Sequence, residues 1–453
     1  DRLGDLGRVG VVVGRGGYIG AGMARFEHRV RSSHQLAVTL REVLPDLPAS
    51  TVERIRAAFL EKLGPERPEA TIGLVPNLAA SRIANRLDLR GPAYTVDAAC
   101  ASSLIAVDRA VRDLVSGQAD AMVVGGVHVV QDVTFWSIFT LLGALSPTQT
   151  IRPFDRRADG LLIGEGVGMV VLKRLADARR DGDRVYAVIR GVGSSSDGRT
   201  SSLMAPDSAG QRLAIERAWA DAGLDPTAPD AVGLIEAHGT ATPAGDGTEL
   251  ATLAAVFGAG TGSAPIGLGS VKSMIGHAMP AAGMAGLIKA ALALYHRTLP
   301  PTLHCDEPHP RFEGTRFVPV RQAAEWERPR SAPRRAGVNA FGFGGINAHV
   351  VLEEYTEAGA AAVAPPAPTA LVAAAVNGAA PNGSANGSAA GSVNGSANGS
   401  GRAAVNGLAG VSARAARPEP EAEPVLLIAG ASPAEVAAQL AAPDDELLAR
   451  DDA

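Results

Sequence analysis

Cys100 is the only cysteine in the first 300 residues, and it lies in the segment 95–104, where an extended run ends and an amphipathic helix is expected to begin. A thiol at a helix start is a candidate nucleophile. The first-turn N–H groups and the helix dipole favour the thiolate and lower a pKa that is ordinarily about 8.5. A lone cysteine is more often a small buried hydrophobe, so the assignment depends on partners elsewhere in the chain.

Three later segments carry polar groups that could assist this thiol: 236–246, 269–277 and 339–349. Each follows a short apolar run typical of a strand and then enters a polar or glycine-rich turn, which is where α/β proteins place their chemistry. His238 or His277 alone would more often be a hydrogen-bonded structural histidine. Both together with a cysteine favour a catalytic site.

Residues 8–354 resemble the ketosynthase family, the condensing enzymes of fatty-acid and polyketide synthases. The turns HGTATPAGDGTE (238–249) and FGFGG (341–345) are closest to those of iterative type I polyketide synthases and polyunsaturated-fatty-acid-type synthases. The residues that match the family's site motifs are Cys100, His238, His277, Lys272 and Phe343.

The resemblance implies an acyltransferase that performs a decarboxylative condensation. Cys100 would accept an acyl group from the 4'-phosphopantetheine arm of an acyl carrier protein, with the N–H groups of Cys100 and Phe343 as the oxyanion hole. His238 and His277 would hydrogen-bond the enolate formed when a malonyl thioester loses carbon dioxide. The domain itself would bind no cofactor and no metal. The alternative is a non-elongating relative that transfers or docks acyl chains.

Supporting roles follow from the same resemblance. Lys272 would keep His277 neutral by like-charge repulsion, and Glu249 is the expected partner of Lys272. The alternative for this pair is a surface ion pair of little energetic value. Thr240 and Thr242 match positions that contact the pantetheine arm, although threonine in such turns also serves local hydrogen bonding.

Composition is consistent with a large α/β enzyme in a reducing cytoplasm. The 453 residues are 46% hydrophobic and 4% aromatic, and the net charge of −5 indicates neither nucleic acid nor an anionic membrane as partner. Two cysteines make no disulfide framework, and we find no signal peptide and no membrane-spanning run. His304, Cys305 and His309 lie in a proline-rich loop that lacks the spacing of a zinc site.

Alternating patterns predict strands at 8–13, 119–127 and 350–353 and a helix over 100–116 that Gly117 ends. A capping box at 50–53 predicts a second helix to about residue 63. By resemblance the fold is the thiolase-like α-β-α-β-α sandwich of two similar halves, and the protein is a homodimer. A nucleotide-binding interpretation of Gly14, Gly16 and Gly20 fails because the third glycine is misplaced.

We expect three regions along the chain: a ketosynthase domain over 1–356, a flexible Ala/Pro/Asn-Gly-Ser linker over 357–424, and the start of a next domain over 425–453. The last region resembles the linker that precedes an acyltransferase domain, which would be the neighbour. Relatives have a leading strand before the point that matches Asp1. The chain is therefore expected to lack part of its first half-sheet and to leave two strands with unpaired backbone groups.

Overall fold

Apolar runs of the sequence form the strands of an 11-stranded mixed sheet and of a separate two-stranded sheet, and amphipathic segments between them form the helices. The computed structural model describes residues 5–18, 20–65, 75–130, 132–200, 202, 205–258, 264–327, 329 and 332–356 and the backbone of 425–429. The strands are β1 (Val9–Arg15), β2 (Ala93–Val96), β3 (Ala121–His128), β4 (Gly166–Arg174), β5 (Ala187–Ser196), β6 (Leu234–Glu236), β7 (Ile266–Gly269), β8 (Thr298–Leu299), β9 (Phe317–Pro319), β10 (Ala324–Glu325), β11 (Arg335–Gly342), β12 (Ile346–Glu353) and β13 (Val425–Ala429). The helices are α1 (Ala21–Glu27), α2 (Ser33–Val43), α3 (Ala49–Lys62), α5 (Leu78–Leu87), α6 (Ser102–Val115), α7 (Val133–Leu141), α8 (Leu175–Asp181), α9 (Ser208–Asp221), α10 (Pro243–Phe257), α11 (Lys272–Ile275) and α12 (Ala282–Tyr295).

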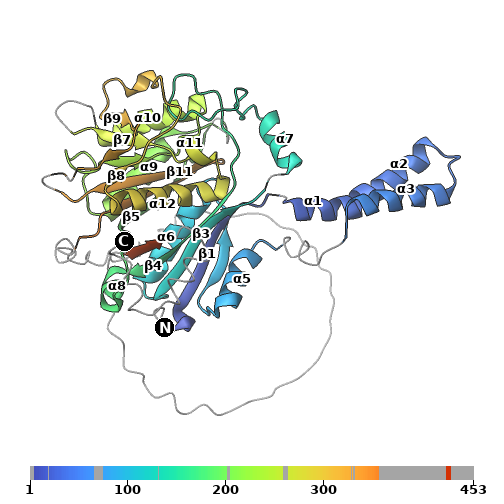
Figure 1. Ribbon diagram of the computed structural model, residues 1–453, viewed down its shortest axis with the longest axis horizontal. Helices are drawn as coiled ribbons and strands as arrows, with labels where there is room; N and C mark the ends of the chain where they lie inside the picture. Colours follow the sequence, from blue (N-terminus) through green and yellow to red (C-terminus); the bar gives the residue numbers. More distant parts are fainter. Residues whose placement is uncertain are drawn as a thin grey trace, which may run out of the picture.

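The sheet consists of two halves with the same topology. Its strand order is β2-β1-β3-β4-β13-β5-β12-β11-β6-β7-β9 (Figure 1). In the first half β2, β1 and β3 are parallel, β4 is antiparallel to β3, and β13 is antiparallel to β4. In the second half β7, β6 and β11 are parallel, β12 is antiparallel to β11, and β5 is antiparallel to β12. Strand by strand, β13 therefore takes the place in the first half that β5 takes in the second.

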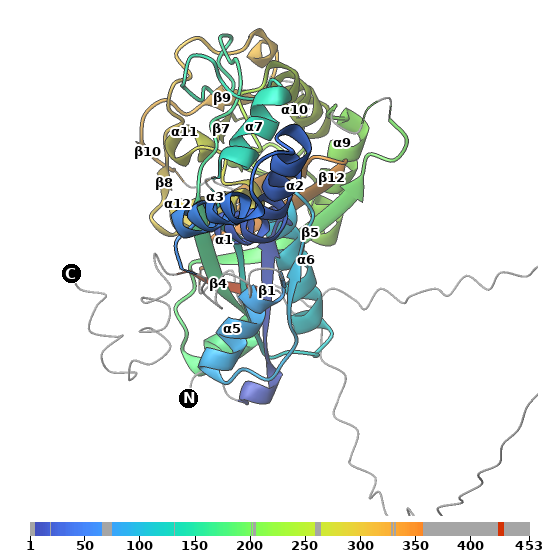
Figure 2. The ribbon, with the colours of Figure 1, turned by 90° about the vertical axis from the view of Figure 1, so that its right-hand side faces the viewer.

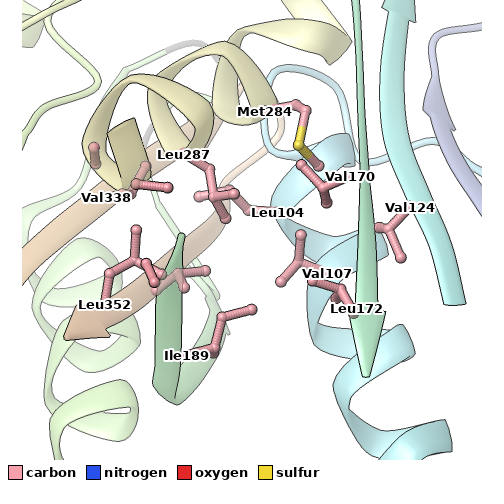
Figure 3. Close-up of a cluster of buried hydrophobic side chains, with 14 of the residues drawn as sticks. Leu104, Val107, Val124, Val170, Leu172, Ile189, Met284, Leu287, Val338 and Leu352 are labelled. Atoms are coloured by element: carbon pink, nitrogen blue, oxygen red, sulfur yellow. The ribbon is translucent and has the colours of Figure 1, made fainter. Parts of the chain in front are cut away.

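Two helices, α6 and α12, lie between the halves and carry the main hydrophobic core. Leu104 and Val107 of α6 and Leu287 of α12 pack with strand residues of both halves, among them Leu172 and Leu352 (Figure 3). Each such fully buried side chain contributes about 1.5–3 kcal/mol. Further clusters place α5 on the outer face of the first half and α9 and α10 on that of the second. The predicted α-β-α-β-α layering is confirmed.

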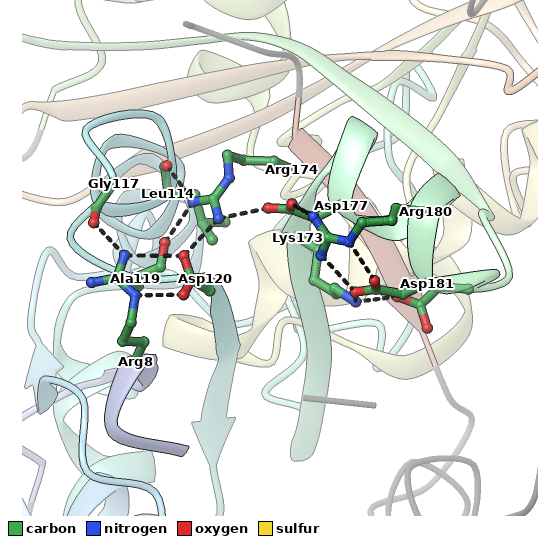
Figure 4. A network of polar contacts seen from close by, with 11 residues as sticks. Arg8, Leu114, Gly117, Ala119, Asp120, Lys173, Arg174, Asp177, Arg180 and Asp181 are labelled. Atoms are coloured by element: carbon green, nitrogen blue, oxygen red, sulfur yellow. Dashed lines mark hydrogen bonds and ion pairs between the residues drawn. The ribbon is translucent and has the colours of Figure 1, made fainter. Parts of the chain in front are cut away.

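A polar network fixes the far end of α6 to the sheet (Figure 4). Arg8 and Arg174 both bond to Asp120, and Arg174 also donates to the carbonyl oxygens of Leu114 and Ala119 at 2.9 and 2.7 Å. The hydrogen bond from Arg8, opposed by burial, holds the pKa of Asp120 at about 2. The Leu114 carbonyl oxygen, in the last turn of α6, thus accepts from a guanidinium as well as from the Gly117 N–H, and the Ala119 carbonyl oxygen just beyond the helix is held by the same guanidinium.

Helices α1, α2 and α3 form an arm that projects from the layered body (Figure 1) and points toward the viewer in Figure 2. The arm is amphipathic but presents Val30, Val43 and Leu44 largely to solvent. Helix α3 begins at Ala49 after Pro48, without a side-chain cap. The predicted capping box at 50–53 was therefore wrong, although the helix itself is confirmed.

The predicted strands and the helix that follows Cys100 are all present, with shifted ends. Helix α6 begins at Ser102 because Ala99 has a φ of +49° and the residues before Ser102 form a turn. Residues 425–429, where the start of a next domain was expected, form the strand β13, which pairs with both β4 and β5 of this sheet. Two strands with unpaired backbone groups were expected from the sequence, but β4 and β5 are both paired here with β13. The linker at 357–424 and the residues after 429 lie outside the described residues.

Candidate active site

The predicted site residues come together where several strands end. Cys100 follows β2, His238 follows β6, Lys272 follows β7, and Phe343 follows β11. β6, β7 and β11 are parallel neighbours, so the turns that follow them lie at one edge of the second half-sheet, and the Cys100 turn after β2 of the first half meets this edge at the cavity. A cavity of about 110 Å³ there is lined by most of the predicted residues: Cys100, His238, Thr240, Thr242, Glu249, His277 and Phe343.

Cys100 lies at the base of this cavity with 4% of its surface exposed. Its turn is held by Ser102, whose Oγ accepts the Ala98 N–H at 2.8 Å and donates to the Ala99 carbonyl oxygen at 2.6 Å. The backbone N–H groups of Phe343 and of Cys100 itself lie near enough to the sulfur to lower the pKa of the thiol, against the larger effect of burial. Two backbone donors therefore converge on the atom that would carry an acyl group.

The expected lowering of the Cys100 pKa was wrong. Burial raises it to about 11, although the charge of Lys272 and the N–H groups of Phe343 and Cys100 act in the opposite direction. Because α6 begins two residues after Cys100, the thiol lies outside the first helical turn. Desolvation of the thiolate outweighs the helix dipole, and the resting residue is a thiol at neutral pH.

His277 has a tautomer that its surroundings fix. The Met279 N–H donates to His277 Nδ1 over 3.2 Å, so the neutral ring carries its proton on Nε2. Burial lowers the pKa of His277 well below its ordinary value, and the charge of Lys272 adds to this effect. His277 can thus act as a neutral hydrogen-bond donor, in the direction expected from the sequence.

His238 lies beside His277, with ring centroids 5.5 Å apart and planes at 83°. Its pKa is also lowered well below the ordinary value, first by burial and then by Lys272. Its Nδ1 is buried and has no hydrogen-bond partner among the described residues. The two imidazoles form a pair of neutral groups at the same cavity.

Lys272 is 2% exposed and begins α11. Burial lowers its pKa, while the negative charges of Glu236 and Glu249 favour its charged form. Glu249 was expected to pair with Lys272. Its carboxylate instead accepts the N–H groups of His238 at 2.7 Å and Gly239 at 2.8 Å. Glu249 therefore acts on Lys272 through its charge and holds the turn that carries His238.

Thr240 and Thr242 line the cavity with their hydroxyl oxygens 3.1 Å apart. Phe343 is 39% exposed, and its ring lies 6.3 Å from that of Phe139 on α7. An aromatic and apolar cluster that includes Phe139 surrounds Cys100. The site thus combines polar and apolar side chains around one cavity.

The sequence did not identify three buried polar residues of this region. Asp246 accepts the N–H groups of Phe154 at 2.6 Å and Ala241 at 3.1 Å, and burial raises its pKa to about 7. Asn339 and His349 lie opposite each other on β11 and β12. Both residues flank the glycine turn at 341–345. In the sequence they differ from the apolar strand residues around them only in being polar, and this was the one signal that could have identified them.

Other parts of the described chain offer less chemistry. A larger cavity of about 590 Å³ is lined mainly by apolar side chains of β4 and α12. Within the described residues, no group of three histidine, cysteine, aspartate or glutamate side chains could hold a metal ion. No helix in that part of the chain is long and apolar enough to cross a membrane.

Three family models match the chain in sequence order. The beta-ketoacyl synthase N-terminal domain matches residues 52–178, and the beta-ketoacyl synthase C-terminal domain matches residues 186–306. The ketoacyl-synthetase C-terminal extension matches residues 308–389. Together the first two contain Cys100, His238, Lys272 and His277.

Similar proteins are much longer than this chain. A polyunsaturated fatty acid synthase protein of Thraustochytrium sp. is 40% identical over 346 residues, which are 72% of this chain and 12% of that protein. A phenolphthiocerol/phthiocerol polyketide synthase protein of Mycobacterium tuberculosis is 45% identical over 284 residues, 62% of this chain and 15% of that protein. The matched region thus spans roughly an eighth to a seventh of these relatives.

Solved structures of similar fold include two domains. The oxazolomycin ketosynthase domain OzmH KS7 from Streptomyces albus JA3453 aligns with a TM-score of 0.65 at 33% identity and covers 77% of this chain and 55% of that one. The ketosynthase from module 6 of the bacillaene synthase from Bacillus subtilis 168 aligns with a TM-score of 0.60 at 38% identity and covers 63% and 51%.

Proposed function

Because the chain belongs to the beta-ketoacyl synthase family, a family of acyltransferases, we propose that it condenses an acyl group held on Cys100 with a malonyl group on an acyl carrier protein. The observation that carries this proposal is the convergence of Cys100, His238 and His277 on one cavity, with two backbone N–H groups at the sulfur. The relatives that are polyketide and polyunsaturated fatty acid synthases support a chain-extending role.

The first half-reaction loads the enzyme. The Cys100 sulfur attacks the thioester carbonyl carbon, and the resulting oxyanion accepts hydrogen bonds from the Cys100 and Phe343 N–H groups. Collapse of this intermediate breaks the bond to the carrier thiol, and the Cys100 proton ends on the departing pantetheine sulfur. Each preorganised donor is worth about 3–4 kcal/mol in comparable sites.

The second half-reaction extends the chain. The malonyl group loses carbon dioxide, and its thioester oxygen takes up negative charge as the enolate forms. His277 Nε2–H and the ring of His238 donate hydrogen bonds to this oxygen, a role for which both imidazoles can stay neutral. The enolate carbon then attacks the acyl-Cys100 carbonyl carbon, and the bond from this carbon to the Cys100 sulfur breaks. The Cys100 thiolate that is released takes a proton from solvent.

Further parts of the proposal concern the context of this domain. Thr240 and Thr242, which line the cavity, would contact the 4'-phosphopantetheine arm, and no cofactor would be bound by the domain itself. We also propose that the continuous part of the ketosynthase ends near residue 356, that a linker follows and leads to β13, and that an acyltransferase domain lies beyond this strand. The working enzyme would be a homodimer.

Intact-protein mass spectrometry with acyl and malonyl carrier proteins tests the proposal, because it reports loading and condensation separately. Cys100→Ala should abolish loading, since it removes the only proposed covalent acceptor. His277→Ala should keep loading and lose malonyl decarboxylation, and His238→Ala should impair decarboxylation more than transfer. Retained acyl-enzyme mass in Cys100→Ala would refute the assignment. A wild-type protein that loads but never decarboxylates malonyl would favour the non-elongating alternative.

A further inference from the structure

A chain of buried hydrogen bonds runs from the outer helix layer to the proposed catalytic turn. The indole N–H of Trp219 on α9 donates to His349 Nε2 over 3.2 Å, and His349 Nδ1 lies 2.6 Å from Asn339 Oδ1. The side-chain Nδ2 of Asn339 then donates to Glu249 Oε1 over 2.9 Å. Trp219 and His349 are fully buried, and Asn339 and Glu249 are each 2% exposed.

The direction of every bond in this chain follows from its first donor. An indole nitrogen can only donate, so His349 Nε2 accepts and the neutral ring carries its proton on Nδ1. The Nδ1–H group then donates to Asn339 Oδ1, which turns the amide N–H of Asn339 toward Glu249. Burial lowers the pKa of His349 to about 3, so the ring stays neutral.

Glu249 connects this series of hydrogen bonds to the candidate active site. Its Oε1 accepts from both Asn339 Nδ2 and the His238 N–H, and its Oε2 accepts from the Gly239 N–H. Burial raises the pKa of Glu249, although the three donors and the charge of Lys272 act in the opposite direction and favour the carboxylate. The carboxylate can bind the turn at His238 only while it faces these donors.

The space around this turn is tight. Gly239 has a φ of +38°, and a Cβ atom there would lie 2.9 Å from both Phe154 and Ser270. The backbone at His238 is therefore fixed by packing on one side and by Glu249 on the other. A rotation of the Glu249 carboxylate would release the second restraint and let the His238 ring move.

We propose that His349 and Asn339 are positioning residues for His238: they fix the Glu249 carboxylate, which in turn fixes the turn that presents this histidine to the reacting enolate. The role rests on the proposed function, because it assumes that His238 contacts the enolate. His349 and Asn339 touch no substrate in this scheme. Their contribution is the orientation of a donor that must lie in place before decarboxylation.

Two substitutions at one position separate positioning from folding. His349→Ala and His349→Asn both lose the contact with Trp219, but only the asparagine keeps an N–H donor where His349 Nδ1 lies. We expect His349→Ala to slow malonyl decarboxylation by about 10- to 100-fold, the range typical for partners of a catalytic histidine. His349→Asn should recover most of that rate, while loading of Cys100 stays close to wild type in both variants.

Asn339→Asp adds a second measurement, the pH dependence of decarboxylation, which a purely structural role of Asn339 would leave unchanged. A protonated carboxyl group can still donate to Glu249, whereas its ionised form faces a second carboxylate and is repelled. Decarboxylation by this variant should therefore fall as the pH rises through the pKa of the introduced group, which Glu249 raises. The other ionisable groups that face Glu249 are Lys272 and Asp246, and both are present in wild type, which should lack this falling limb.

Glu353→Gln is the matched control. Glu353 lies on the same face of β12 as His349 and pairs with Arg190 and Arg335, each at 2.6 Å, away from the cavity. The Glu353→Gln variant should have a lower melting temperature than wild type, and its ratio of decarboxylation to loading should be unchanged. Equal rates in His349→Ala and His349→Asn, or an unchanged pH profile in Asn339→Asp, would overturn the positioning role. A wild-type enzyme without decarboxylation would instead remove the proposed function.

Discussion

At Cys100, burial and charge act on the same thiol in opposite directions. Desolvation raises its pKa, and Lys272 together with the Phe343 and Cys100 N–H groups lowers it, with a resulting value of about 11. The same N–H groups that stabilise a thiolate would also stabilise an acyl oxyanion. The site is therefore organised for the charge that develops during the reaction rather than for a permanently ionised nucleophile.

This balance predicts how Cys100 responds to pH. The reaction of Cys100 with iodoacetamide should become about tenfold faster per pH unit between pH 7 and pH 9, because the thiolate fraction keeps rising below a pKa of about 11. The measurement is a stopped-time alkylation assay on Cys305→Ala, which leaves only this thiol. Cys100→Ala serves as the control, since burial raises the pKa of the remaining Cys305 to about 12. A plateau near pH 7 would contradict the argument and restore an activated thiolate.

At the scale of elements, the position of Cys100 depends on how closely β1 approaches α6. A Cβ atom on Gly14 would lie 2.6 Å from the backbone of both Ser102 and Ser103, which is too close for any side chain. The first turn of α6 thus rests directly on β1. Any residue larger than glycine must push the helix start, and with it the Cys100 turn, away from the sheet.

Gly14→Ala is accordingly expected to destabilise the protein by about 1–3 kcal/mol, the usual cost of overpacking a filled core. It should also slow the loading of Cys100, because the sulfur moves away from the Phe343 N–H group. Chemical denaturation and the loading assay measure the two effects. Gly20→Ala is the control, since no atom lies within 4 Å of a Cβ atom there. Equal stability of the two variants would show that the β1–α6 contact can relax.

Most elements near the site could be predicted because their signals are local. The alternating and apolar patterns around β1, α6 and β3 lie within single segments, and so do the turns after β6 and β7. The Cys100 pKa could not be predicted, because it depends on burial in the folded protein and on Lys272 and the Phe343 N–H group, which come from distant segments. The link from Trp219 to His349 spans 130 residues, and sequence spacing carries no trace of such a contact.

At the scale of the whole molecule, the two halves share one topology but obtain their matching strands from different parts of the chain. β5 precedes the other strands of its half, whereas β13 comes from the far C-terminal side of the sequence. Because β13 pairs with β4 over Arg174 to Val170 and with β5 over Ile189 to Ala187, it joins both halves into one sheet. The position between β4 and β5 is thus occupied by a strand that is distant from both in the sequence.

A proline at Leu427 tests whether β13 stabilises the fold. Leu427 lies opposite Leu172 on β4 and Ala187 on β5, so its N–H group belongs to a ladder with a neighbour on each side. Leu427→Pro removes that donor and leaves a carbonyl group without its partner, which costs about 1–3 kcal/mol when the group is buried.

Leu427→Pro should therefore unfold at lower denaturant concentration than Leu427→Val, which keeps the N–H group, and should bind more of a hydrophobic dye as β13 detaches. Detachment would expose the edges of β4 and β5, which are competent to pair with other chains, so light scattering should rise with protein concentration. If the two variants unfold at the same denaturant concentration, β13 contributes nothing to stability. The two halves would then be held together without β13, mainly by the core around α6 and α12 that Leu104 and Leu287 share.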